Sequence, residues 1–142
     1  MLESINIYSP IAIYLQIENE IRFAIARGDL EENDQLPAVQ KLAKQLDINF
    51  NTVAKAYRDL EVMGLIYTRR GMGCFIQKNV TNTCKERCTN EIIGRLHEVT
   101  QEAVASGMGK KTLRDALSVS FDTDSPVYGE PPKKVMALAK GK

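Results

Sequence analysis

Two short runs of apolar residues between residues 37 and 64 constrain the fold more than any other feature of the sequence. The first run follows Pro37 at helical spacing: Val39, Leu42, Ala43 and Leu46. The second run follows Asn49 at the same spacing: Val53, Ala56, Tyr57, Leu60 and Met63. Only Asp47 and Ile48 separate them, so the pattern predicts two helices joined by a tight turn, with Asn49 as N-cap of the second.

The second of these helices has a polar face opposite its apolar face. That face carries Asn51, Thr52, Lys55, Arg58 and Asp59. In a major groove an amide can pair with adenine, a lysine can meet guanine, and a threonine methyl can contact thymine. A solvated helix face has the same composition, so this face alone does not identify a DNA reader.

After Gly64 the pattern changes from helical to strand-like. Residues 65–68 and 74–77 form two short runs around the turn Arg69-Arg70-Gly71-Met72-Gly73. Glycine accepts the positive φ that a tight hairpin requires. We therefore expect a β-hairpin, or wing, with two arginines at its tip.

Helical patterns flank this segment on both sides. A first helix is expected over residues 10–27, capped by Ser9 and ended by Gly28, and a long fourth helix and a short fifth (110–119) follow the wing. Prolines and a glycine after residue 122 predict loop and a frayed terminus. The expected fold is mainly α with a small β-hairpin: a winged helix-turn-helix (1–78), a helical dimerisation region (79–121) and a flexible tail (122–142).

The fourth helix has an apolar stripe that little of its own chain is left to cover. The stripe includes Cys88, Ile92, Leu96 and Val99. A second copy of the same element would cover it, and self-pairing usually follows two-fold symmetry. The sequence thus predicts a homodimer, which would place two recognition helices about 34 Å apart on an inverted-repeat site.

Charge is unevenly distributed although the net charge is only +1. Residues 1–34 hold two basic and seven acidic side chains, whereas residues 35–78 hold seven basic and three acidic ones. Clustered cations favour a polyanionic partner. A mixed solvated surface would explain the same imbalance, so charge alone leaves both interpretations open.

The cysteines and the single histidine are the candidates for reactive or metal-binding groups. Cys84 and Cys88, four residues apart on the fourth helix, allow a thiol- or metal-responsive pair or simple core packing. His97 has no partner at metal spacing, and neither a phosphate loop nor a nucleophile set is present, so no metal site, cofactor or enzyme activity is predicted. No signal peptide or membrane span is recognised, which predicts a cytoplasmic protein without membrane contact.

Residues 28–76 resemble the DNA-binding domain of the GntR family of transcriptional regulators, and the brief helical tail resembles that of the YtrA subfamily. The resemblance implies a cytoplasmic homodimer that binds double-stranded DNA and is commonly a repressor. It leaves a small-molecule effector open and unidentified. The main alternative is a winged helix that docks on a protein through its third helix, which salt dependence of binding would distinguish.

Three positions before the recognition helix depart from the family pattern. Gln40 stands in place of an arginine, Ala38 in place of a capping serine, and Asn33 in place of a glycine whose left-handed geometry asparagine tolerates. Phe50 also stands where proline is common, whereas Arg70 and Gly71 match positions that the family uses for DNA contact. The DNA-binding residues predicted are Gln40, Asn49, Asn51, Thr52, Lys55, Arg58, Arg69, Arg70 and Gly71.

Overall fold

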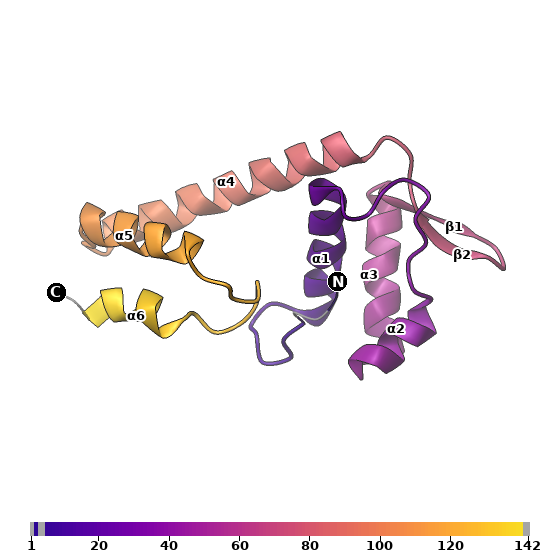
Figure 1. Ribbon diagram of the computed structural model, residues 1–142, viewed down its shortest axis with the longest axis horizontal. Coiled ribbons are helices and arrows are strands. Elements are labelled where there is room, and N and C mark those ends of the chain that lie inside the picture. The colour runs from indigo at the N-terminus through magenta and orange to yellow at the C-terminus, as the bar shows by residue number, and fades with distance from the viewer. Residues whose placement is uncertain (1, 3–4, 141–142) are drawn as a thin grey trace. The chain divides into compact units, whose positions relative to one another are not determined.

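The computed structural model describes residue 2 and residues 5–140. Its elements, shown in Figure 1, are α1 (Ile13–Arg27), α2 (Val39–Leu46), α3 (Phe50–Val62), β1 (Ile66–Arg69), β2 (Gly73–Ile76), α4 (Thr81–Ala105), α5 (Lys110–Phe121) and α6 (Lys133–Lys140). The chain forms two compact units, Met1–Thr89 and Asn90–Lys142, with the boundary inside α4. The predicted class, mainly α with a small β-hairpin in a winged helix-turn-helix, is confirmed.

The core of the first unit lies where α1 and α2 pack on α3. Ile17, Ile21 and Ile25 of α1 are fully buried at helical spacing. Val53 and Leu60 of α3 are equally buried. Each such side chain contributes about 1.5 to 3 kcal/mol when it leaves water, so this packing fixes which face of α3 points inward.

Helix α1 begins later than the sequence indicated. We expected a start at Pro10 with Ser9 as cap, but the helix begins at Ile13 and its N-cap, Ala12, provides no side-chain hydrogen bond. Ser9 instead closes a turn, because its Oγ accepts a hydrogen bond from the Ile11 amide at 3.1 Å. Ser9 therefore forms the kind of side-chain hydrogen bond expected of a cap, but it does so in a turn that precedes the helix.

The segment before α1 is held by a buried amide, Gln16. Its Nε2 donates to the carbonyl oxygens of Asn6 (2.9 Å) and Ile11 (2.8 Å), and its Oε1 accepts from the Asn6 amide (2.8 Å). Gln16 is fully buried, so these backbone groups have exchanged water for one side chain. The amide replaces the missing cap as the anchor of the N-terminal segment.

The wing is an antiparallel pair with Ile66 opposite Ile76 and Arg69 opposite Gly73. Residues 33–36, which precede α2, pair with the free edge of β2. Asn33 N and Leu36 N donate to Ile76 O and Cys74 O, and Ile76 N donates to Asp34 O. Gly73 has φ 116°, a backbone conformation that favours glycine, and a Cβ there would lie 2.8 Å from the movable end of the Gln35 side chain. The sequence analysis predicted no pairing for residues 33–36.

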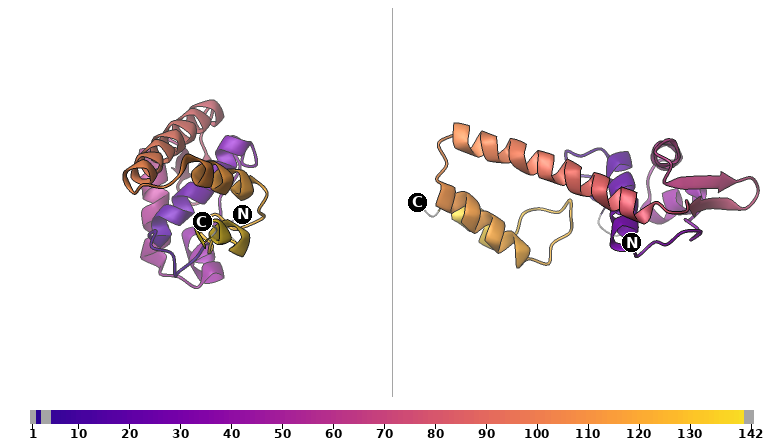
Figure 2. Two further views of the ribbon diagram at one scale, coloured as in Figure 1. Left: turned by 90° about the vertical axis from the view of Figure 1, so that its left-hand side faces the viewer. Right: turned by 90° about the horizontal axis from the view of Figure 1, so that it is seen from above.

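The second unit contains the end of α4, with α5 and α6 packed on each other. Figure 2 shows α4 as one unbroken helix. Helix α5 extends to Phe121, two residues beyond its predicted end.

The prediction of loop from residue 122 onward is wrong for Lys133–Lys140, which forms α6. The prolines and the glycine that suggested loop end at Pro132, a residue suited to a helix start, and strong helix formers follow it. Residues 141–142 of the predicted tail lie outside the described residues. None of the described helices has the length and apolar character that crossing a membrane requires.

We predict that Gln16→Ala lowers the free energy of unfolding by about 2 to 3 kcal/mol, because it leaves three backbone groups of residues 6 and 11 without their partner. Gln45→Ala, at an exposed position of α2, is the matched control and should change stability by less than about 0.5 kcal/mol. Urea unfolding followed by circular dichroism measures both. Equal stability of the two variants would show that Gln16 does not anchor the N-terminal segment.

Candidate nucleic-acid interface

The outer face of α3 is set by a cap at its start and by its buried inner face. Asn49 is the N-cap, as predicted, and its Oδ1 accepts a hydrogen bond from the Asn51 amide at 2.7 Å. Asn51 and Arg58 are exposed, and Thr52 is half-buried beside them. Phe50, the first residue of the helix, is also exposed. The helix therefore offers an amide, a hydroxyl and a guanidinium on one accessible side.

Tyr57 ties α3 to the segment before α2. Its hydroxyl donates to the Pro37 carbonyl oxygen at 2.6 Å, and burial raises the pKa of Tyr57, which keeps it protonated as a donor. Helix α2 begins two residues later after Ala38, which gives no side-chain cap, as its departure from the family pattern implied. Gln40, in the first turn of α2, is exposed.

Lys55 is less free than the sequence suggested. Its Nζ lies 3.1 Å from Asp59 Oδ2 and 4.5 Å from the centroid of the Tyr14 ring. The side chain is therefore held between α1 and its own helix. A partly exposed pair four residues apart contributes only about 0.3 to 0.5 kcal/mol, and an ammonium group has three donors, so Lys55 can meet a second partner while it stays beside Asp59.

Glu18 lies behind this pair and was missed by the sequence analysis. It is only 4% exposed, and it shares a hydrogen bond with Asp59. Burial and the neighbouring Asp59 raise the pKa of Glu18 to about 7, while the same hydrogen bond and Lys55 lower the pKa of Asp59. The usable signal was its position: Glu18 falls four residues after Tyr14 and three before Ile21, on the apolar face of α1.

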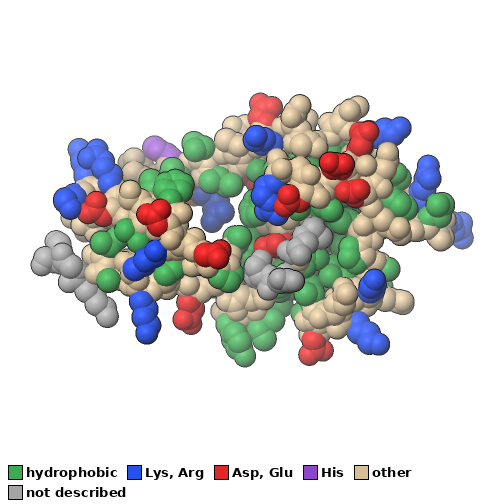
Figure 3. Space-filling model, viewed as in Figure 1, with side chains coloured by type: hydrophobic (Ala, Val, Ile, Leu, Met, Phe, Trp, Pro, Cys, Tyr) green, Lys and Arg blue, Asp and Glu red, His purple; other side chains and the backbone are tan. Residues whose placement is uncertain are grey.

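The wing presents its arginines to solvent. Arg69 and Arg70 are exposed, and basic side chains stand out at the end of the hairpin in Figure 3. Gly71, at φ 78°, makes the turn at the tip. On the described part of the chain, neither arginine forms an ion pair. Both guanidinium groups are therefore available to an anion.

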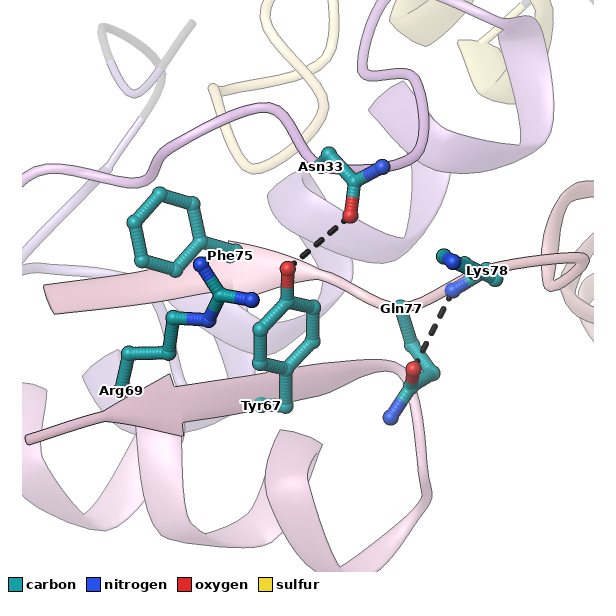
Figure 4. A pocket seen from close by; sticks show the side chains of 6 residues that line it. All are labelled: Asn33, Tyr67, Arg69, Phe75, Gln77 and Lys78. Carbon is teal, nitrogen blue, oxygen red and sulfur yellow. Dashed lines mark hydrogen bonds between the residues drawn. The ribbon is translucent and has the colours of Figure 1, made fainter.

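One face of the wing is an open depression of about 680 Å³, shown in Figure 4. Its lining residues are Asn33, Tyr67, Arg69, Phe75, Gln77 and Lys78. The Tyr67 and Phe75 rings stack with centroids 5.6 Å apart, and the Tyr67 hydroxyl donates to Asn33 Oδ1 at 2.9 Å. Asn33 has φ 68°, which confirms the left-handed geometry expected for it. These contacts stiffen the wing beside its basic tip.

The residues predicted for dimerisation divide into two groups. Cys88 is buried in the core of the first unit, so we remove it from the pairing surface. Ile92, Leu96 and Val99 are each about half exposed. Within the second unit an apolar groove of about 510 Å³ runs between α4 and α5, and Leu96 and Val99 line it.

The buried cysteines favour core packing over a sensor role. Cys84 Sγ donates to the Arg22 carbonyl oxygen at 3.3 Å, and burial beside Cys88 raises the pKa of Cys84 to about 12. A thiol held protonated is a poor nucleophile and a poor metal ligand. Among the described residues no three His, Cys, Asp or Glu side chains are grouped to hold a metal ion.

Comparisons with known proteins give consistent matches. Residues 13–76 match the family model described as bacterial regulatory proteins, gntR family. The chain is 36% identical over 83 residues to the uncharacterized HTH-type transcriptional regulator YhcF of Bacillus subtilis, a match that covers 57% of this chain and 69% of that protein. It is 34% identical over 107 residues to the HTH-type transcriptional repressor YtrA of the same organism, covering 75% of this chain and 82% of YtrA.

The fold also matches a solved structure over most of the length of both chains. The crystal structure of a transcriptional regulator from Oenococcus oeni superposes with a TM-score of 0.61 at 34% sequence identity. The superposition covers 84% of this chain and 98% of that one. The similarity therefore includes residues beyond the wing.

Proposed function

The chain belongs to the GntR family of bacterial regulatory proteins, and on that premise we propose that it represses transcription by binding an inverted-repeat operator in double-stranded DNA as a homodimer. One observation carries this proposal. A capped helix with exposed Asn51 and Arg58 lies in the same compact unit as a stiff hairpin with two exposed arginines at its end. The cytoplasm, where bacterial DNA lies, is the proposed location.

We propose that α3 enters the major groove and reads base edges. Asn51 and Arg58 are exposed, and Thr52 adds a methyl group and a hydroxyl; these are the chemical types that discriminate bases. Asn49 acts mainly through the cap that orients the first turn, because its side-chain oxygen is already engaged. Gln40, an exposed residue of α2, would contact phosphate or a base as a neutral donor.

We propose that the wing contacts the DNA backbone through Arg69, Arg70 and the amide of Gly71. Backbone contacts by cations release condensed counterions and so make binding depend steeply on salt. A winged helix that docks on a protein through an apolar interface, the alternative function, would bind with little dependence on salt. No small-molecule effector and no enzymatic role is proposed, and the matched relatives are named as regulators.

We propose that a second copy covers the exposed stripe Ile92, Leu96 and Val99. The stripe borders the apolar groove between α4 and α5, so a facing helix from another protomer would bury both together. Such burial is the usual reason for a large exposed apolar patch. A two-fold pairing would then match a two-fold operator.

Asn51→Ala should weaken binding to the operator by about 1 to 3 kcal/mol, because one base-edge contact is lost while the fold stays intact. The operator is first recovered by selection from a random DNA pool, and affinity is measured by fluorescence anisotropy. Asn82→Ala, an exposed position at the start of α4, is the matched control and should bind as the parent does. Unchanged affinity of Asn51→Ala would remove α3 as the base reader.

Replacing both Arg69 and Arg70 by alanine should weaken binding to operator and random duplexes alike. The plot of log K against log salt has a negative slope, and the magnitude of this slope should fall by about 1 for each lost phosphate contact. Arg87→Ala, an exposed arginine on α4, controls for the loss of positive charge and should leave the slope unchanged. A loss confined to the operator would instead make the wing a reader of bases.

Leu96→Glu should convert the homodimer to a monomer and weaken operator binding, because a carboxylate would be buried at the pairing surface. Sedimentation velocity measures the assembly, and circular dichroism checks the fold. Val127→Glu places the same charge on another exposed apolar residue of the second unit and should leave the dimer intact. A Leu96→Glu variant that remains a dimer would place the pairing surface elsewhere.

A further inference from the structure

Glu18 is a carboxyl group buried between α1 and α3, where an uncompensated charge is costly. Its Oε1 has no hydrogen-bond partner among the described residues, and the group shares a hydrogen bond with Asp59. The charged groups that act on it are Asp59 and Lys55 from α3 and Arg22 from its own helix. Burial and Asp59 outweigh the two cations, and the pKa of Glu18 rises to about 7.

The two carboxyl groups divide their roles. Because the pKa of Glu18 is raised and that of Asp59 is lowered, the shared proton resides on Glu18 and the negative charge on Asp59. Glu18 is therefore the donor and Asp59 the acceptor. Asp59 also accepts from Lys55 Nζ at 3.1 Å, so it joins a buried residue of α1 to an accessible cation of α3.

Lys55 is then held from two directions. Asp59 holds its ammonium from within α3, and the Tyr14 ring lies 4.5 Å away on α1. Lysine has a long flexible side chain, and fixing it before binding removes part of the entropy that a DNA contact would otherwise lose. The position of the ammonium thus depends on a hydrogen bond that the protonated Glu18 supplies.

We propose that Glu18 is a positioning residue for DNA recognition, acting through Asp59 to set Lys55 at the edge of α3. The inference rests on the proposed function, because positioning Lys55 matters only if the protein binds DNA. Glu18 itself does not touch DNA in this scheme.

The direction of the pH effect follows from the charges. When pH rises through the pKa of Glu18, a second negative charge appears beside Asp59 and the donated hydrogen bond is lost. Lys55 is then attracted more strongly toward the protein, and the added charge repels phosphate. DNA affinity should therefore fall as pH rises through about 7.

The test measures affinity for a duplex recovered by selection from a random pool, at about pH 6 and about pH 8. The parent chain should bind about three- to tenfold more weakly at the higher pH. Glu18→Gln keeps a donor for Asp59 but does not titrate, so its affinity should match the parent's at the lower pH and stay constant. His97→Asn removes the only histidine and should keep the parent's pH dependence.

The outcomes separate this inference from the proposed function. Glu18→Gln with the parent's pH dependence, or a parent whose binding is intact but independent of pH, would overturn the inference alone. Failure to recover any duplex at the lower pH would overturn the proposed function and the inference with it.

A second measurement covers the case in which Glu18→Gln does not fold. The Glu18 carboxyl resonance of the parent chain, free and bound to the selected duplex, gives its titration directly by NMR. A midpoint near 7 that shifts on binding supports the inference. A midpoint below about pH 5 would overturn it.

Discussion

The inward packing of α3 is the constraint on which the rest of the first unit depends. Val53, Ala56 and Leu60 are fully buried against neighbouring helices, and the Tyr57 hydroxyl fixes the helix to Pro37. Rotating α3 by one residue, about 100°, would bring polar side chains into this core. The face that Asn51 and Arg58 present to solvent is thus determined by residues that never meet a ligand.

Features with a local cause were predictable from the sequence. The Asn49 cap, the glycine turn of the wing and the left-handed Asn33 each depend on a few neighbouring residues, and each is present. Features with a distant cause were not. The segment before α1 is held by Gln16, which reaches back ten residues to Asn6, whereas Ser9 as a cap and Pro10 had indicated an earlier start of the helix.

In the candidate site, too, features with a local cause were predictable and features with a distant cause were not. The exposed polar side chains could be listed from periodicity, but part of the restraint on Lys55 comes from the Tyr14 ring on another helix. The apolar stripe of α4 likewise changes its role along one helix: Cys84 and Cys88 complete the core, whereas Ile92 and Leu96 are exposed. Periodicity gives the direction of a side chain, and only the tertiary structure shows what lies there.

The pairing of residues 33–36 with β2 makes the wing inseparable from the chain that leads into α2. Asn33, Asp34 and Leu36 supply backbone hydrogen-bond partners for Cys74 and Ile76, and the Gln35 side chain lies against Gly73. Anyone grafting this hairpin onto a related regulator to transfer its specificity would have to move the linker as well. The transferable module is discontinuous, and a hairpin excised at its own two ends would carry an unmatched sheet edge.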